Sequence, residues 1–232
     1  LYPIVSDWWN SKVQTRAVEN YNKIVAEMDD DTAEKLIQQA RDYNEKLFHT
    51  KSSIVNADTV EGYDDILNIS DTGVMGYISI PFIKVELPIY HGTSEEVLNI
   101  AAGHLKGTSF PVGGTNTHAV ISAHRGLPSS KLFTDLDKLV VGDIFTINIL
   151  GESYTYEVEE ILIIKPDEID KLEIIPNGDY VTLMTCTPYG VNTHRLLLRS
   201  HRIETQQEYD ARVPADATQV DPMLAVPAIA LP

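Results

Sequence analysis

The chain contains one cysteine, Cys186, which ends the apolar stretch at residues 181–186. Taken alone, a single cysteine in such a stretch is more often a small buried residue than a nucleophile. The turn-forming residues 187–190 follow it directly, so the thiol is expected at the rim of a sheet, where strand ends commonly present reactive groups. A thiol attacks as the thiolate and therefore needs a base or a cation nearby.

Two further residues have suitable chemistry. His124 ends the apolar stretch 120–123 and is followed by a turn, and Arg195 comes 195 − 186 = 9 residues after Cys186. This spacing lets two antiparallel strands joined by a short turn place a thiol and a guanidinium at one rim. Arginine stays charged and can donate hydrogen bonds to a developing oxyanion. Each residue also has an ordinary interpretation, as a turn histidine and a strand-edge charge, but the three together favour catalysis.

Other kinds of site have less support. His118 and His124 are six residues apart, and with one cysteine in the chain they make no zinc-ligand set. Acyl transfer by a thiol, a base and a cation requires no metal and no organic cofactor, so we expect neither. An L,D-transpeptidase also pairs Cys, His and Arg, but its cysteine follows a His-Gly step, whereas Met184 and Thr185 precede Cys186.

The composition excludes several classes of protein. The 232 residues include 18 basic and 34 acidic side chains, a formal net charge of −16, so binding to phosphate backbones or to an anionic membrane surface is disfavoured. Apolar residues make up 43% of the chain, enough for a packed core. No apolar run reaches the ~18 residues of a transmembrane helix. We interpret both ends as cuts in a longer gene product, and natural frayed termini fit these residues equally well.

Two helices are expected before residue 49. Apolar residues recur at the helical period along 13–28 and along 33–48, separated by an acidic run at 29–32. Asp31, with Glu34 three residues on, resembles a capping box. The simplest interpretation is two helices of opposite direction joined by a solvated acidic turn.

From residue 73 onward the pattern changes to short strands broken by Gly and Pro, and residues 49–71 are polar and poorly periodic, as in a loop. A capping-box pattern at 93–98 predicts a short helix among the strands. Seven or more strands with a few short helices predict a mainly β protein with a closed barrel. The predicted strands are Gly76–Ile80, Lys84–Ile89, His118–Ala123, Ile144–Leu150, Tyr154–Ile164, Tyr180–Cys186 and His194–Ile203.

Residues 182–186 match the T-L-x-T-C signature of sortases, and further segments resemble class C, the pilus-assembling sortases of Gram-positive bacteria. These segments are Ile89–Gly92, Gly103–Leu105 with Thr108-Ser109, Ala123–Pro128 and Cys186–Leu196. The resemblance runs densely from about Gly73 to Glu204, and a helical N-terminus is typical of that class.

The resemblance implies a sortase-type eight-stranded β-barrel with short helices and an N-terminal helical extension. It implies a cysteine transpeptidase in which Cys186 attacks the threonine carbonyl of an LPxTG-like sorting signal. Arg195 then holds the oxyanion and His124 transfers protons. A lysine amine of another pilin subunit resolves the thioester and gives an isopeptide-linked pilus. Thr185 is expected to bind the substrate by helping to orient it.

The resemblance also implies partners, location and domain limits. The partners are pilin subunits that carry a C-terminal sorting signal and an acceptor lysine, and the location is the extracellular face of the cell membrane, with the full-length protein membrane-anchored. We expect a helical region at 1–48, a lid-like loop at 49–71 and the sortase β-barrel catalytic domain at 72–204. Residues 205–232 are expected to be a tail cut before a membrane segment.

The lid-like loop departs from the class C pattern. Class C sortases usually have a lid anchored by an Asp-Pro-aromatic motif, whereas here Asp58 is followed by Thr59 and Val60, and the one aromatic ring in 49–71 is Tyr63. Either Tyr63 substitutes for the missing ring or the segment is mobile. Few apolar contacts are expected to hold the segment, so we favour mobility.

Two alternative functions fit the same residues. A housekeeping-type sortase uses the same three residues but transfers the thioester to a cell-wall amine. A non-enzymatic surface-adhesion barrel instead predicts that Cys186 is unreactive.

Overall fold

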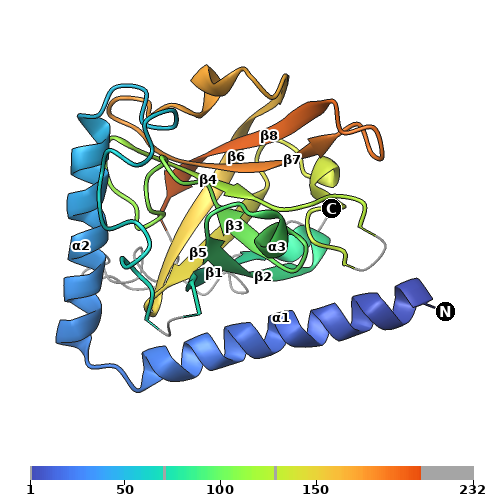
Figure 1. Cartoon of the computed structure of the whole chain (residues 1–232), viewed down its shortest axis with the longest axis horizontal. Helices are drawn as coiled ribbons and strands as arrows, with labels where there is room; N and C mark the ends of the chain where they lie inside the picture. The colour runs from blue at the N-terminus through green and yellow to red at the C-terminus, as the bar shows by residue number, and fades with distance from the viewer. Residues whose placement is uncertain (1, 70–71, 128–129, 205–232) are drawn as a thin grey trace, which may run out of the picture.

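The computed structural model describes residues 2–69, 72–127 and 130–204, with side chains from Trp9 onward. The expected tail at 205–232 lies outside the described residues. Eight strands form a closed barrel in the order β1-β2-β3-β4-β7-β8-β6-β5. The strands are labelled in Figure 1. They are β1 (Val74–Ile80), β2 (Val85–His91), β3 (Ala102–His104), β4 (Thr117–Ser122), β5 (Ile144–Ile149), β6 (Glu152–Ile164), β7 (Asp179–Thr187) and β8 (His194–Ile203). The predicted mainly β barrel is confirmed.

The seven predicted strands are present, and the eighth, β3, was not predicted. It has three residues, too few to show the alternation by which a strand is identified. Gly103 at its centre lies so close to β2 that an added Cβ would be 2.3 Å from the carbonyl oxygen of Gly92. Two strand pairs are parallel, β2 with β3 and β4 with β7. Because β4 and β7 run in the same direction, both end at the same end of the barrel.

The N-terminal helices α1 (Tyr2–Ala26) and α2 (Asp30–Phe48) lie along two different sides of the barrel and form an L (Figure 1). The expected opposite direction is therefore wrong, because each helix packs on the barrel and not on the other helix. The expected cap is also wrong. The side chain of Asp29, not Asp31, accepts a hydrogen bond from the N–H of Thr32 at 2.9 Å.

Buried polar side chains fasten both helices to the barrel. On α1, the hydroxyl of Tyr21 donates to the carbonyl oxygen of Met75 and accepts from the N–H of Leu150, at 2.9 and 3.0 Å. On α2, the amide of Asn44 bonds both backbone groups of Phe110, at 2.9 and 2.7 Å. These bonds satisfy buried groups that would otherwise be costly to leave without partners.

Two shorter elements complete the part that positions the site. The predicted short helix is α3 (Glu95–Leu98), and Ser94 caps it through the N–H of Val97. The 3₁₀-helix η3 (Ile169–Leu172) lies in the connection from β6 to β7. Within the described residues, no helix is both long and apolar enough to span a membrane.

Candidate active site

Cys186 lies at the end of β7, directly opposite Arg195 at the start of β8. Residues directly opposite on antiparallel strands project from the same face of the sheet, so the thiol and the guanidinium share one face. The side chain of Cys186 is partly exposed. Arg195 is held at the β7–β8 turn, because its Nη1 donates to the carbonyl oxygens of Asn192 and His194 at 3.3 and 3.2 Å.

His124 reaches the same rim from β4. The last paired residues of the parallel strands β4 and β7 are Ser122 and Met184, and the N–H of Ala123 then donates to the carbonyl oxygen of Met184 at 3.2 Å. His124 and Cys186 lie two residues beyond Ser122 and Met184 respectively. Cys186 projects from the face that carries Arg195, and His124 leaves the end of β4 at the same rim. The structure therefore brings the three predicted residues to one strand-end rim.

Thr185 lies on the opposite, core side of β7. It is buried, and its hydroxyl donates to the carbonyl oxygen of Ala123 at 2.8 Å. This bond joins the strand end that carries Cys186 to the chain that carries His124. The hydroxyl of Thr185, which is expected to help orient the substrate, thus has a partner within the protein and faces the core.

A second apolar cluster lies on the face that carries the rim. Its buried members come from four neighbouring segments and lie apart from the main barrel core: Val120, Ile164, Leu172 and Leu197. Met184, two residues before the thiol, packs against them, as do Leu105 and Ile54. We call this set the outer-face cluster. Met184, Leu105 and Ile54 are partly exposed, so apolar side chains beside the rim are available to an extended peptide.

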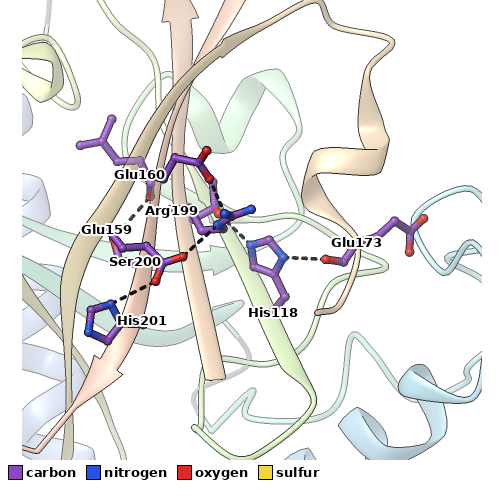
Figure 2. Close-up of polar contacts among 9 residues, drawn as sticks. His118, Glu159, Glu160, Glu173, Arg199, Ser200 and His201 are labelled. Atoms are coloured by element: carbon purple, nitrogen blue, oxygen red, sulfur yellow. Dashed lines mark hydrogen bonds and ion pairs between the residues drawn. The ribbon is translucent and has the colours of Figure 1, made fainter. Parts of the chain in front are cut away.

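His118 ties the end of η3 to β4 through the backbone of Glu173, as Figure 2 shows. Its Nδ1 is 2.8 Å from the carbonyl oxygen of Glu173, and its Nε2 is 2.7 Å from the hydroxyl of Thr182. A carbonyl only accepts, so Nδ1 carries the proton and Nε2 accepts from Thr182. Burial lowers the pKa of His118 to about 4, which keeps this neutral arrangement at neutral pH. The β6–β7 connection is thereby tied to β4 beside Leu172.

The same view shows Arg199 on β8, next to His118 (Figure 2). Its guanidinium pairs with Glu159 at 3.3 Å and with Glu160, both on β6. The Arg199 guanidinium is therefore neutralised by two carboxylates. Within the described residues, Arg195 bonds only to backbone carbonyls.

Residues 49–69, which we call the rim segment, are held by Tyr63. This side chain is 3% exposed and stacks on Phe110 and His104, with ring centroids 5.4 and 5.7 Å apart. Its hydroxyl lies 2.9 Å from Nδ1 of His104 and accepts from the N–H of Gly92 at 2.9 Å. The expectation of few apolar contacts is wrong, because Val60 and Leu67 are buried in the same core. The sequence does not show which ring partners a loop residue will meet.

The tautomer of His104 follows from its second partner. Its Nε2 is 2.8 Å from the carbonyl oxygen of Ser109, so Nε2 carries the proton and Nδ1 accepts from Tyr63. Burial lowers the pKa of His104 to about 4 and raises the pKa of Tyr63. Asp58, the other lid candidate, is 91% exposed and pairs with Lys106 at 2.5 Å, a surface contact of little energetic weight.

The rim segment also contacts the outer-face cluster. Ile54 packs against the outer-face cluster, to which Met184 belongs. Gly107, at φ +91°, has the backbone of the rim segment so close that an added Cβ would lie 2.7 Å from the carbonyl oxygen of Ser53.

In the described residues, no group of three or more His, Cys, Asp or Glu side chains is arranged to hold a metal ion.

A family model described as Sortase domain matches residues 78–203. Among curated proteins, Sortase A of Streptococcus agalactiae serotype III is 32% identical over 117 residues, which are 49% of this chain and 47% of that protein. Sortase D of Bacillus subtilis is 29% identical over 115 residues, 50% of this chain and 55% of that protein. The chain spans about half the length of these curated relatives.

Solved structures match over more of the chain. Sortase C1 from Streptococcus agalactiae superposes with a TM-score of 0.74 at 50% identity, covering 82% of this chain and 99% of that one. Sortase C from Clostridium perfringens SM101 gives 0.70 at 41% identity, with 82% and 99% covered. A structure of Clostridium perfringens sortase C with the C-terminal cell wall sorting motif gives 0.73 at 45% identity, with 82% and 100% covered.

Proposed function

We propose that this chain is a pilin-polymerising cysteine transpeptidase. The chain belongs to the sortase family and resembles the class C members of that family throughout the barrel. The observation that carries the proposal is the placement of Cys186 opposite Arg195, with His124 leaving the neighbouring strand at the same rim. A thiol, a proton carrier and a fixed cation on one face are the groups that acyl transfer requires.

In the first half-reaction, the Cys186 thiolate attacks the threonine carbonyl of the sorting signal. A C–S bond forms, and Arg195 donates hydrogen bonds to the resulting oxyanion. The bond between threonine and glycine then breaks, and the leaving amine takes its proton from the His124 imidazolium. The products are a thioester on Cys186, a neutral His124 and a free amino terminus.

In the second half-reaction, the neutral ε-amine of an acceptor lysine attacks the thioester. The C–N bond forms, the C–S bond breaks, and the amine proton passes to His124. The thiolate and the imidazolium are thereby restored, and the two subunits are joined by an isopeptide bond. Every group that the cycle needs is supplied by the chain and its two substrates.

A housekeeping-type sortase is the second candidate, since the curated relatives include proteins named Sortase A. It would use the same three residues with a cell-wall amine as acceptor. The class C proposal has the broader support, because the sortase C structures match at higher identity and over more of the chain than these curated relatives do.

The proposal is tested with purified protein, a sorting-signal peptide and two acceptors. We expect a thioester adduct of the peptide on Cys186, and we expect transfer to a pilin that carries its lysine but not to a peptidoglycan-stem mimic. Mass spectrometry of the adduct and of any ladder gives both readouts. An adduct with transfer only to the stem mimic would support the housekeeping function, and a thiol that never acylates would support the adhesion barrel.

We further propose that the rim segment acts as a lid whose anchor is Tyr63 instead of the usual Asp-Pro-aromatic motif. The supporting contacts are the ring stacking on Phe110 and the packing of Ile54 against the outer-face cluster. Asp58 has only a surface role in this proposal, through Lys106.

Replacing Tyr63 with alanine is expected to accelerate thiol labelling of Cys186 about tenfold or more. Loss of a buried aromatic ring costs about 3 kcal/mol or more, and each 1.4 kcal/mol changes a population tenfold. Tyr63→Phe retains the ring and loses the hydroxyl contacts, so a smaller increase is expected. Val55→Ala, at a rim-segment residue that is 67% exposed, is the matched control. Equal labelling rates for wild type, Tyr63→Ala and a chain lacking residues 54–62 would show that the site is already open.

Sortases are cell-surface enzymes of Gram-positive bacteria. We propose that this one works at the extracellular face of the membrane, anchored outside the described residues, on pilins with a C-terminal sorting signal. The proposed division into a helical region at 1–48, a lid at 49–71 and a catalytic barrel at 72–204 agrees with this function.

A further inference from the structure

A cavity of about 420 Å³ opens behind the catalytic rim. Its lining residues follow each of the three rim residues in the chain: Arg125 comes after His124, Thr187 after Cys186 and Leu196 after Arg195. Because side chains alternate along a strand, Thr187 and Leu196 project from the opposite face of the sheet to Cys186 and Arg195. We call this the reverse-face cavity, because it lies on the opposite face of the sheet to the outer-face cluster.

One wall of the reverse-face cavity is an exposed apolar strip on β6. Ile163 is 66% exposed, and Ile161 on the same face is partly exposed. β8 pairs with β6 as far as Ile164, but β5 pairs only with residues 152–157. Within the described residues, the edge of β6 that faces away from β8 therefore has no strand paired with it at 160–164. An open strand edge beside apolar side chains suits an extended polypeptide.

The opposite wall contains a buried donor without a partner. The side chain of Arg125 is 9% exposed and pairs with Asp137, but within the described residues its Nε has no hydrogen-bond partner. Buried N–H groups are nearly always bonded, so this one points to a missing acceptor such as a peptide carbonyl. Tyr189 covers the guanidinium, 5.9 Å from its ring centroid, and packs against Gly126. The two turns that carry His124 and Cys186 therefore meet at this cavity.

We infer that the reverse-face cavity binds an extended segment of the acceptor subunit around its lysine, an inference that rests on the proposed function. The reaction needs two polypeptides, and the outer-face cluster lies on the face of Cys186 and Arg195, where the sorting signal must be attacked. The incoming amine must reach the thioester on Cys186 and pass its proton to His124 at the same rim, and Arg125, the neighbour of His124, lines the reverse-face cavity. Asp137, partly exposed in that cavity, attracts the lysine ammonium before the amine loses its proton.

The test compares two acceptors of one thioester. The enzyme is acylated with a sorting-signal peptide and then given either a blocked peptide with a central lysine flanked by valines or hydroxylamine, an amine too small to need the cavity. For Ile163→Asp, the ratio of lysine-peptide transfer to hydroxylamine transfer is expected to fall about tenfold, equivalent to 1.4 kcal/mol. Ile163 is exposed, so the substitution leaves the core intact. Val13→Asp, at a partly exposed residue of α1, is the matched control with no expected change in the ratio.

A second variant tests the buried donor. Arg125→Lys keeps a charge beside Asp137 but removes Nε. We therefore expect the KM for the lysine peptide to rise severalfold, and the rate of transfer to hydroxylamine is the reference for any general loss of activity. Unchanged ratios in both variants, or equal losses with both acceptors, would overturn the acceptor site. Loss of acylation in Ile163→Asp would instead assign the cavity to the sorting signal. A wild-type protein that forms no thioester would overturn the proposed function itself, which separates the two failures.

Discussion

Cys186→Ala is expected to form no acyl-enzyme with a sorting-signal peptide and to assemble no pilin ladder. The loss should be roughly 10⁴-fold or more, the scale seen when the nucleophile of a covalent catalyst is removed. Cys186 is the one thiol of the chain, so no second cysteine can take over its role. The readouts are intact-protein mass spectrometry for the thioester and gel electrophoresis for the ladder.

The fold of this variant should be unchanged, because Cys186 is partly exposed at a strand end and no hydrogen bond of the described chain uses its sulfur. Thermal unfolding of both proteins provides the control. Wild type that has been blocked with a thiol reagent should lose the same activity by an independent route. Ladder formation by a folded Cys186→Ala protein would refute the mechanism.

Arg195→Lys is expected to lower kcat by ~10²-fold or more, the effect of removing one oxyanion donor. Lysine keeps the positive charge but lacks the planar fork through which Arg195 bonds the turn carbonyls at 3.2–3.3 Å while donating to an oxyanion. The matched control is Arg202→Lys on the same strand, whose side chain lies over Tyr154 at the far end of β8. Near-wild-type kcat with a raised KM would show that Arg195 only binds substrate.

The pH dependence separates His124 from Arg195. Because His124 transfers protons, His124→Ala should flatten the pH–rate profile as well as lower the rate, whereas Arg195→Lys should lower the rate and keep the profile. Rates are measured for acylation and for transfer at each pH. A bell-shaped profile that survives in His124→Ala would assign the proton transfers to another group.

Local sequence determined the elements that carry the candidate catalytic residues. β7 and β8 are recognisable because short-range alternation specifies a half-buried strand, and the turn between them fixes which residues face each other. The nine-residue separation of Cys186 and Arg195 therefore predicted that the two lie near one rim, and the structure pairs them directly. His124 was found in the same way, as the residue that follows an apolar strand.

Tertiary structure decided the features that depend on contacts between distant residues. Tyr63 meets His104, 41 residues away, and His118 meets Thr182, 64 residues away, so neither contact has a local signal. The same holds for β3, which exists because its neighbours pair with it, and for the L of α1 and α2, set by packing on the barrel. The reverse-face cavity likewise forms only when the turns after His124 and Cys186 meet. Burial and long-range pairing are properties of the closed barrel, whereas strand period and turn chemistry are properties of the local chain.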